Sequence, residues 1–135
     1  MVRPDGQDKV KTRKAAMNKR EVGSTKESKA CDYLSKKGYH ILAQNYRVRQ
    51  AEIDIVCSYE HTLVFVEVKY RSDASKGFPA ESVDIRKQKK ISKAALFYMN
   101  SHHINPETTS VRFDVIAILQ DEITHYENAF DFLWG

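Results

Sequence analysis

The chain has 135 residues, of which 41% are hydrophobic and 30% charged, so it is long enough for one domain with a buried core. It contains no apolar run near the roughly 20 residues of a transmembrane helix, and no apolar core of a signal peptide. These features predict a cytoplasmic protein without a membrane partner. Cys31 and Cys57 lack zinc-type spacing and are predicted to be reduced core thiols.

The net charge of +4 is unevenly distributed along the chain. Residues 1–112 carry all 22 Lys and Arg together with 13 acidic residues, whereas residues 113–135 carry five acidic residues and no Lys or Arg. A basic body favours an anionic partner such as nucleic acid, and an ordinary solvated surface is an equally open explanation. We expect residues 1–18 to form a flexible basic tail and residues 19–135 to form a single domain.

A first helix is predicted at residues 19–37, with Gly38 as its stop signal. Ala30 and Leu34 define its apolar face. Glu27 falls on the same face, which is unusual for a glutamate. An edge position that reaches water, or a salt bridge to a lysine, would also explain this placement.

Three strands are predicted next, at residues 39–47, 52–58 and 63–70. The first ends in a basic turn at Arg47, which is a candidate contact for nucleic acid. The second alternates acidic and aliphatic residues and carries Asp54. The third is so rich in β-branched and aromatic residues that both its faces are predicted to be covered. Glu67 and Lys69 therefore share one face of a buried strand, where an isolated charge is costly.

A loop at residues 71–79 follows, and its Lys76–Gly77 region is a candidate lid. A second helix is predicted at residues 80–101. It carries Lys87 on its inward stripe and Lys90 on its flank, and both are candidate contacts for nucleic acid, although a basic helix face is more often simply solvated.

Two final strands are predicted at residues 111–119 and 123–130, followed by an apolar end at residues 132–134 that is expected to dock on the core. Phe130, Phe132 and Trp134 in this region are candidate contacts of a homodimer. The element order αβββαββ predicts an α/β protein in which helices flank a central mixed β-sheet.

The unusual acidic residues Glu27, Asp54 and Glu67 come from three separate elements. Carboxylates gathered around a cleft repel one another unless a cation joins them, and Mg²⁺ or Mn²⁺ suits such oxygen ligands. A metal ion among carboxylates on a basic protein indicates phosphodiester hydrolysis. Lys69 would then orient or deprotonate the attacking water, or stabilise developing charge.

Several short motifs occur in a characteristic order along residues 20–119. They are Gly23-x-x-x-Glu27-x-x-Ala30, Gly38-Tyr39-x-Ile41-Leu42, Asn45-Tyr46-Arg47, Glu52-Ile53-Asp54-Ile55-Val56, Leu63-Val64-Phe65-Val66-Glu67-Val68-Lys69, Phe78-Pro79-Ala80-Glu81-x-Val83 and Arg112-Phe113-Asp114-Val115. Together they resemble the YraN-like family of small bacterial proteins. That family is similar to archaeal Holliday junction resolvases and to the PD-(D/E)XK nuclease superfamily, which has a restriction-endonuclease-like fold.

The resemblance implies a DNA nuclease, for which branched DNA is one candidate substrate. It also implies Mg²⁺ or Mn²⁺ held by Asp54, Glu67 and the backbone carbonyl of Val68. It further implies a catalytic role for Lys69 and an assisting role for Glu27. Two departures from the family pattern are Lys26 and Ala51, which stand where the family usually has glycine.

Two other functions stay open at this stage. One is a nucleic-acid-binding protein on a nuclease fold that does not cut. The other is a structural or interaction protein in which Asp54, Glu67 and Lys69 form only a buried ion-pair network.

Overall fold

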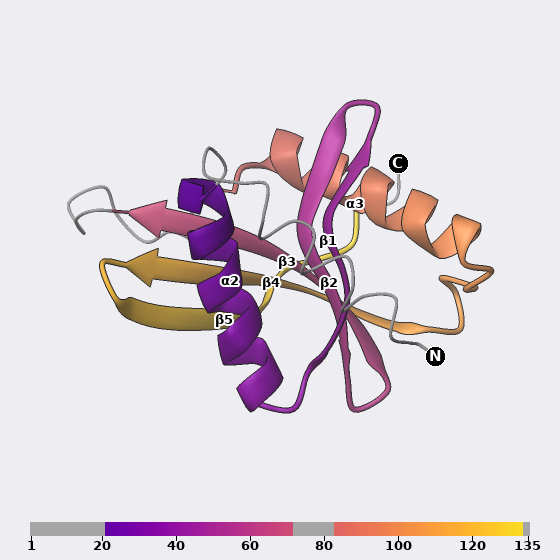
Figure 1. Ribbon diagram of the computed structural model, residues 1–135. Helices are drawn as coiled ribbons and strands as arrows, with labels where there is room; N and C mark the ends of the chain where they lie inside the picture. The colour runs from indigo at the N-terminus through magenta and orange to yellow at the C-terminus, as the bar shows by residue number, and fades with distance from the viewer. Residues whose placement is uncertain (1–20, 72–82, 134–135) are drawn as a thin grey trace.

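The computed structural model describes residues 21–71 and 83–133 (Figure 1). Its elements, in chain order, are α2 (Glu21–Lys36), β1 (His40–Val48), β2 (Ala51–Tyr59), β3 (Thr62–Arg71), α3 (Ile85–Ser101), β4 (Ser110–Leu119) and β5 (Glu122–Phe130). The predicted α/β class and the order αβββαββ are confirmed. The predicted tail at residues 1–18, the candidate lid at Lys76–Gly77 and Trp134 lie outside the described residues.

The five described strands form one mixed sheet in the order β1-β2-β3-β4-β5. Neighbouring strands are antiparallel except for β3 and β4, which are parallel. A parallel pair requires a crossover, and α3 lies in that connection. The sheet therefore places β3, the strand with the unusual charged pair, at its centre.

Local sequence explains two of the reversals of the chain. Gly38 has φ +96°, and the Tyr39 amide donates to the Leu34 carbonyl at 3.0 Å, as in a Schellman motif that ends α2. Between β2 and β3, Glu60 and His61 have φ 47° and 67°, which matches a two-residue type I′ hairpin turn. The predicted stop signal at Gly38 is confirmed.

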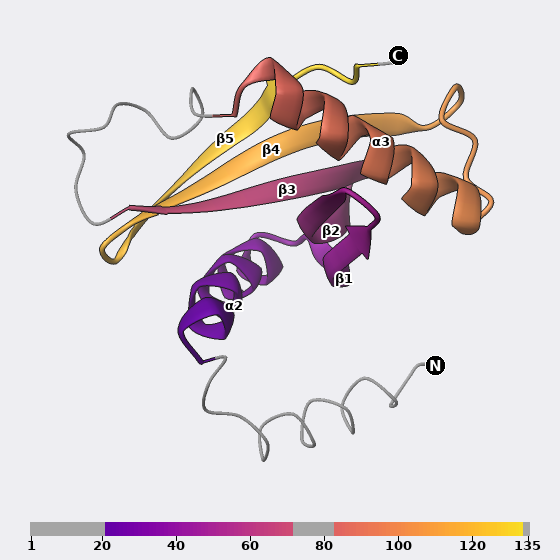
Figure 2. The same ribbon diagram turned by 90° about the horizontal axis from the view of Figure 1, so that it is seen from above.

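The two described helices, α2 and α3, cover opposite faces of the sheet, as Figure 2 shows from above. Ala94, Ala95 and Met99 of α3 pack with Phe65 and Phe113 on one face. On the other face, Ala30 and Leu34 of α2 pack with aliphatic residues of the sheet, namely Ile55, Val64, Val66, Ile116 and Ile118. Burial of these side chains on both faces drives the layered arrangement.

The predicted start of the second helix was wrong, since α3 begins at Ile85 rather than at residue 80. Asp84 has an extended backbone, and its carboxylate accepts a hydrogen bond from the Lys87 amide at 2.9 Å. An aspartate in this arrangement is an N-cap, which fixes the first turn of the helix. The cap also orients Lys87 at the start of α3.

Phe130 and Phe132, near the C-terminus, pack inward, and the predicted docking of the apolar end on the core is confirmed for Phe132. Phe130 and Phe132 contact the ring of Phe113, with centroid distances of 5.1 Å and 5.5 Å. The Leu133 amide donates to the buried Ser92 hydroxyl at 3.0 Å. The chain end therefore completes the core beside α3.

Both cysteines are free, as predicted. Burial raises the pKa of the Cys57 thiol to about 12 and that of Cys31 to about 11, which keeps both in the unreactive thiol form. Neither described helix is long and apolar enough to cross a membrane.

Candidate functional site

The candidate site begins where the ladder between β2 and β3 stops. The two strands are paired from Tyr59 and Thr62 to Ile55 and Val66, and no strand pairing continues beyond that point. There the Val68 amide donates to Oδ2 of Asp54 at 2.7 Å. A side chain thus replaces the missing backbone acceptor, which satisfies the amide and fixes the position of the Asp54 carboxylate.

Glu67 lies one residue before Val68 and is only 6% exposed. Its Oε2 atom is 2.7 Å from Nζ of Lys87 and 3.4 Å from Nζ of Lys69. Lys69 comes from the same face of β3, as the two-residue spacing predicted, and Lys87 comes from the first turn of α3. Two cations therefore compensate one buried carboxylate.

Asp54, Glu67 and Lys87 line a cavity of about 410 Å³, which we call the Asp54–Glu67 cleft, and Lys69 lies beside Glu67 without lining it. Its polar lining comes mainly from β2, β3 and the start of α3, and includes Glu52, Asp54, Glu67, Arg86, Lys87 and Lys90. Acidic residues on the strands thus face basic residues on the helix. Such a cleft can hold a cation and an anionic ligand together.

Burial is the main influence on the charge of Asp54 in the cleft, and repulsion from Glu67 comes second. Burial and the neighbouring Glu67 raise the pKa of Asp54 to about 7, against the lowering effect of the Val68 amide. Glu27 and Glu52 raise it further. Without an added cation, Asp54 is therefore about half protonated at neutral pH.

The pKa of Lys87 is raised. Burial acts in the opposite direction, but the hydrogen bond and charge of Glu67 outweigh it. Lys87 is therefore held as a cation against Glu67.

Glu27 occupies a different position from Asp54 and Glu67. It is partly exposed and accepts a hydrogen bond from Nδ2 of Asn45 at 2.9 Å, which matches the edge position that reaches water. The backbone of Asn45 has φ 52°, a conformation that asparagine tolerates better than most residues. Glu27 does not line the cleft, although its charge acts on Asp54.

The three predicted nucleic-acid contacts are not in one place. Lys87 and Lys90 line the cleft, whereas Arg47 lies on β1 and pairs with Glu52 at 3.4 Å. Arg47 therefore contacts Glu52, a residue of the cleft, without lining the cleft itself. Ala51 starts β2 opposite Val48 and is not among the residues with positive φ, so the turn does not need glycine there.

The carboxylates of the Asp54–Glu67 cleft are candidate ligands for Mg²⁺. Among the described residues, no group of three or more His, Cys, Asp or Glu side chains could hold a metal ion. Mg²⁺, however, is commonly held by only one or two carboxylates together with water and substrate phosphate. Of the two oxygens of the Asp54 carboxylate, only Oδ2 contacts another described residue, and of those of Glu67, only Oε2 does. Among the described residues, one oxygen of each carboxylate is therefore left for a cation. The donor set fits such a site.

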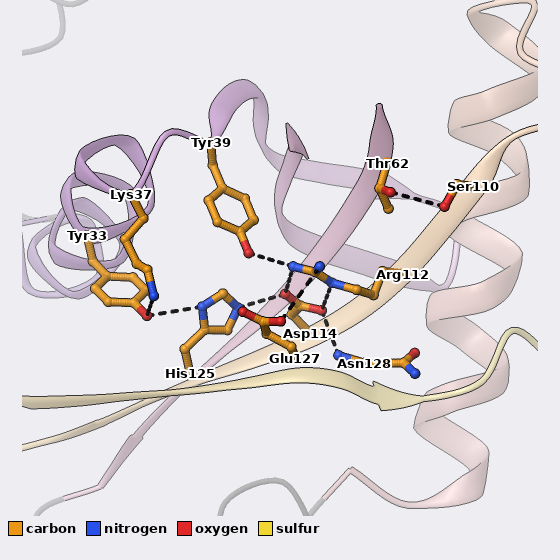
Figure 3. A network of polar contacts seen from close by, with 10 residues as sticks. All are labelled: Tyr33, Lys37, Tyr39, Thr62, Ser110, Arg112, Asp114, His125, Glu127 and Asn128. Carbon is orange, nitrogen blue, oxygen red and sulfur yellow. Dashed lines mark hydrogen bonds and ion pairs between the residues drawn. The ribbon is translucent and has the colours of Figure 1, made fainter. Parts of the chain in front are cut away.

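A second polar cluster, not predicted from the sequence, lies on the α2 face of the sheet (Figure 3). Asp114 is fully buried and receives a bidentate contact from Arg112, at 2.9 Å and 2.8 Å. Nε2 of His125 lies 2.7 Å from Oδ2 of Asp114, and the Asn128 amide donates to Oδ1 at 2.9 Å. Burial alone would raise the pKa of Asp114, but these contacts outweigh it and lower the pKa.

The cluster connects the sheet to α2. His125 Nδ1 is 3.1 Å from the Tyr33 hydroxyl, and Nη2 of Arg112 donates to the Tyr39 hydroxyl at 2.5 Å. Figure 3 shows these tyrosines reaching from α2 and the start of β1 towards Arg112 and His125. We interpret the cluster of Arg112, Asp114 and His125 as structural, since Asp114 is fully buried, and we call it the Asp114 cluster. The only sequence signal for it is the Arg112-Phe113-Asp114 motif, in which the i, i+2 spacing places the two charges on one face.

Comparison with known proteins agrees with the motifs. The sequence profile of the uncharacterised protein family UPF0102 matches residues 26–118. A UPF0102 protein of Lachnoclostridium phytofermentans is 51% identical over 115 residues, which cover 85% of this chain and 97% of that relative. A relative from Clostridioides difficile is 44% identical over 84% of this chain and 100% of its own length. A relative from Pelobacter propionicus is 42% identical over 97% of this chain and 98% of its own length. The chain therefore belongs to the UPF0102 family, the YraN-like family that its motifs resemble.

Proposed function

We propose that this protein is a metal-dependent nuclease that hydrolyses phosphodiester bonds in DNA. The observation that supports the proposal most strongly is the arrangement of Asp54, Glu67 and Lys69 at the end of the β2–β3 ladder. All three come from the motifs that resemble the YraN-like family, which is itself similar to PD-(D/E)XK nucleases, and Asp54 and Glu67 line one cleft. The basic start of α3 faces them, as an anionic substrate requires.

Asp54 and Glu67 would hold Mg²⁺ or Mn²⁺ through their remaining carboxylate oxygens. The carbonyl of Val68 is a further candidate ligand, because it belongs to the stretch of β3 that has left the ladder with β2. When bound, the ion would supply positive charge between the two carboxylates and polarise the phosphate group. The raised pKa of Asp54 supports this assignment, since burial and then the charge of Glu67 oppose its negative charge, and a bound cation would stabilise that charge.

Lys69 and Lys87 would stabilise the negative charge that develops on the phosphate as the bond is attacked. Both Nζ atoms lie within 3.4 Å of the same Glu67 oxygen, so they are held in place before substrate binds. Because Lys69 is paired with a carboxylate, we favour its action as a cation over its action as a base. Glu27 would act as a more distant positioning group.

Lys90 and Arg86, at the rim of the cleft, would bind phosphates next to the one that reacts. Arg47, which contacts Glu52, would add a further contact. These residues neutralise backbone charge and carry no sequence information, so binding by them alone would be insensitive to base sequence.

A second candidate function is DNA binding without cleavage. The short contact between Lys87 and Glu67, at 2.7 Å, favours it because a lysine already provides the positive charge at that carboxylate. A purely structural role for the ion pairs is the third possibility. Nucleic-acid binding separates the structural role from the other two functions, and metal-dependent cleavage separates the first function from the second.

The proposal is tested with a panel of labelled DNA substrates, namely single strand, duplex, flap and four-way junction, each with Mg²⁺, Mn²⁺ or EDTA. We expect cleavage of at least one substrate with metal and none with EDTA. Lys69→Ala should lose cleavage but keep binding, whereas Lys36→Ala, which changes an exposed lysine of α2, should keep both cleavage and binding. Binding without cleavage across the panel would support the second function and refute the nuclease.

A further inference from the structure

A second cavity of about 610 Å³ lies beside the Asp54–Glu67 cleft. It is formed between the β1–β2 turn and the outer side of α3, and we call it the cationic groove. Its lining includes Val48, Arg49, Lys89, Lys93, Leu96 and Phe97. Figure 1 shows the β1–β2 hairpin rising beside α3.

The groove differs from the cleft in its charge. Every ionisable side chain that lines it is a cation, namely Arg49, Lys89, Lys90 and Lys93. In the part of the chain that the structure describes, none of these four forms an ion pair with a carboxylate. Their positive charge is thus available to an anionic ligand, and closely spaced unpaired cations favour a polyanion over a single small anion.

The groove also presents an exposed aromatic ring. Phe97 is 55% exposed, although Phe is usually buried, and it lies next to the lysines and to Leu96. An aromatic ring among cations is the combination by which proteins bind single-stranded nucleic acid, since the cations follow the phosphates and the ring stacks on a base. In an intact duplex the bases are already stacked on one another, so this ring has much less to contact.

The groove is continuous with the candidate site. Gln50, Ala51 and Lys90 line both cavities. A strand in the groove would therefore enter the cleft across Ala51 and Lys90 and bring a phosphate to Asp54 and Glu67.

We propose that the cationic groove binds single-stranded DNA and guides it into the Asp54–Glu67 cleft. The substrate of the site is then a free strand or the unpaired arm of a branched molecule. This inference rests on the proposed function for its consequence, namely cleavage, but the binding itself can be measured separately.

The first test measures fluorescence anisotropy of a labelled 12-nucleotide oligodeoxythymidine, in EDTA so that no cleavage occurs. Phe97→Ala should weaken binding by about 5- to 140-fold, the loss expected for one stacked base. Binding to a 12-base-pair duplex should change much less. Leu42→Ala is the matched control, because Leu42 is 49% exposed but lies on β1 outside the groove, and it should leave both affinities unchanged.

The second test measures the dependence of the same affinity on salt. The double variant Lys89→Gln, Lys93→Gln should reduce the slope of log affinity against log salt by about 1.4, since each lost phosphate contact on a single strand contributes about 0.7. The matched control exchanges the exposed Lys29 and Lys36 of α2 for Gln and should preserve the slope. Circular dichroism confirms folding, and the lysine variants provide an independent test if Phe97→Ala is unstable.

The groove assignment is overturned if Phe97→Ala leaves single-strand affinity intact, or if it weakens duplex and single-strand binding equally. It is also overturned if both lysine pairs reduce the slope to the same extent. Groove-dependent binding by a protein that cuts none of the substrates would support the groove and refute the nuclease. Metal-dependent cleavage that is unchanged by substitution of Phe97, Lys89 and Lys93 would support the nuclease and refute the groove.

Discussion

Replacing Asp54 with asparagine should stabilise the metal-free protein, and by an amount that depends on pH. The amide oxygen of Asn can still accept the hydrogen bond from the Val68 amide, which is 2.7 Å from the carboxylate in the wild type. What the substitution removes is the charge that burial and the nearby Glu67 oppose. The carboxylates of Glu27 and Glu52 oppose it as well, and the cations Lys69 and Lys87 are already engaged by Glu67.

The sign follows from the two pKa values of Asp54. In the unfolded chain it titrates near 3.8, and in the folded protein at about 7. Between these values the folded state retains a proton that the unfolded state has lost, so the free energy of unfolding of the wild type falls as pH rises. At about 1.4 kcal/mol per pKa unit, the loss above pH 7 is on the order of 4 kcal/mol at most.

Urea unfolding in EDTA at pH 4 and at pH 8 measures this effect. Asp54→Asn should be close to wild type at pH 4 and more stable by up to about 4 kcal/mol at pH 8. The same exchange at Asp32, an exposed residue of α2, is the matched control and should show no such gain. A gain that is equal at both pH values, or a loss at pH 8, would refute the electrostatic reasoning.

Three further predictions concern the Asp114 cluster, Mg²⁺ binding in the Asp54–Glu67 cleft and the N-cap of α3. Asp114→Asn should lower the free energy of unfolding by about 3 kcal/mol at neutral pH, because it breaks a buried pair with Arg112. Since the pKa of Asp114 is lowered in the folded protein, this contribution should be lost in the wild type as pH falls below 3.8, and acid titration of stability checks this. Calorimetry should find Mg²⁺ binding about tenfold weaker at pH 6 than at pH 8, because Asp54 must lose its proton to bind the ion, and a pH-independent affinity would argue against Asp54 as a ligand. Asp84→Ala should cost about 1 kcal/mol in urea unfolding through loss of the N-cap, whereas Asp84→Asn should cost much less.

Periodicity in the sequence was sufficient to predict most of the fold. The central strand around Phe65 was recognisable because its β-branched and aromatic residues are buried on both faces. The start of α3 was misplaced because an N-cap is recognised by its backbone conformation, and the acidic and small residues before Asp84 looked equally compatible with a helix. The docking of the apolar end on the core was predicted, but its contact with Phe113 was not, because Phe113 is distant in the sequence.

The candidate site was only partly predictable. Asp54, Glu67 and Lys69 were identified because each breaks an apolar pattern in neighbouring strands, and the structure places Asp54 and Glu67 in one cleft, with Lys69 beside Glu67. Lys87 was expected only to contact nucleic acid, and its pairing with Glu67 could not be foreseen because no local pattern relates a helix residue to a strand twenty residues earlier. The roles of all these residues in catalysis and binding remain predictions.

The contacts of Asp114 with His125 and Arg112 were missed for a similar reason. His125 lies on an edge strand, where a histidine looks like an exposed residue, and its burial becomes clear only when α2 is packed over β5. Sequence patterns report which face a residue occupies, whereas the partner on that face depends on the packing of elements that are distant in the chain.

The most direct test of the proposed function is single-turnover cleavage of an end-labelled flap DNA at pH 8, followed on a denaturing gel as Mg²⁺ is titrated. The wild type should produce discrete products only when Mg²⁺ is present, and Asp54→Asn should produce none while its affinity for the DNA in EDTA is retained. If Asp54→Asn cleaves at the wild-type rate, or if the wild type fails to cleave with either Mg²⁺ or Mn²⁺, then the Asp54–Glu67 cleft is not the catalytic centre of a nuclease.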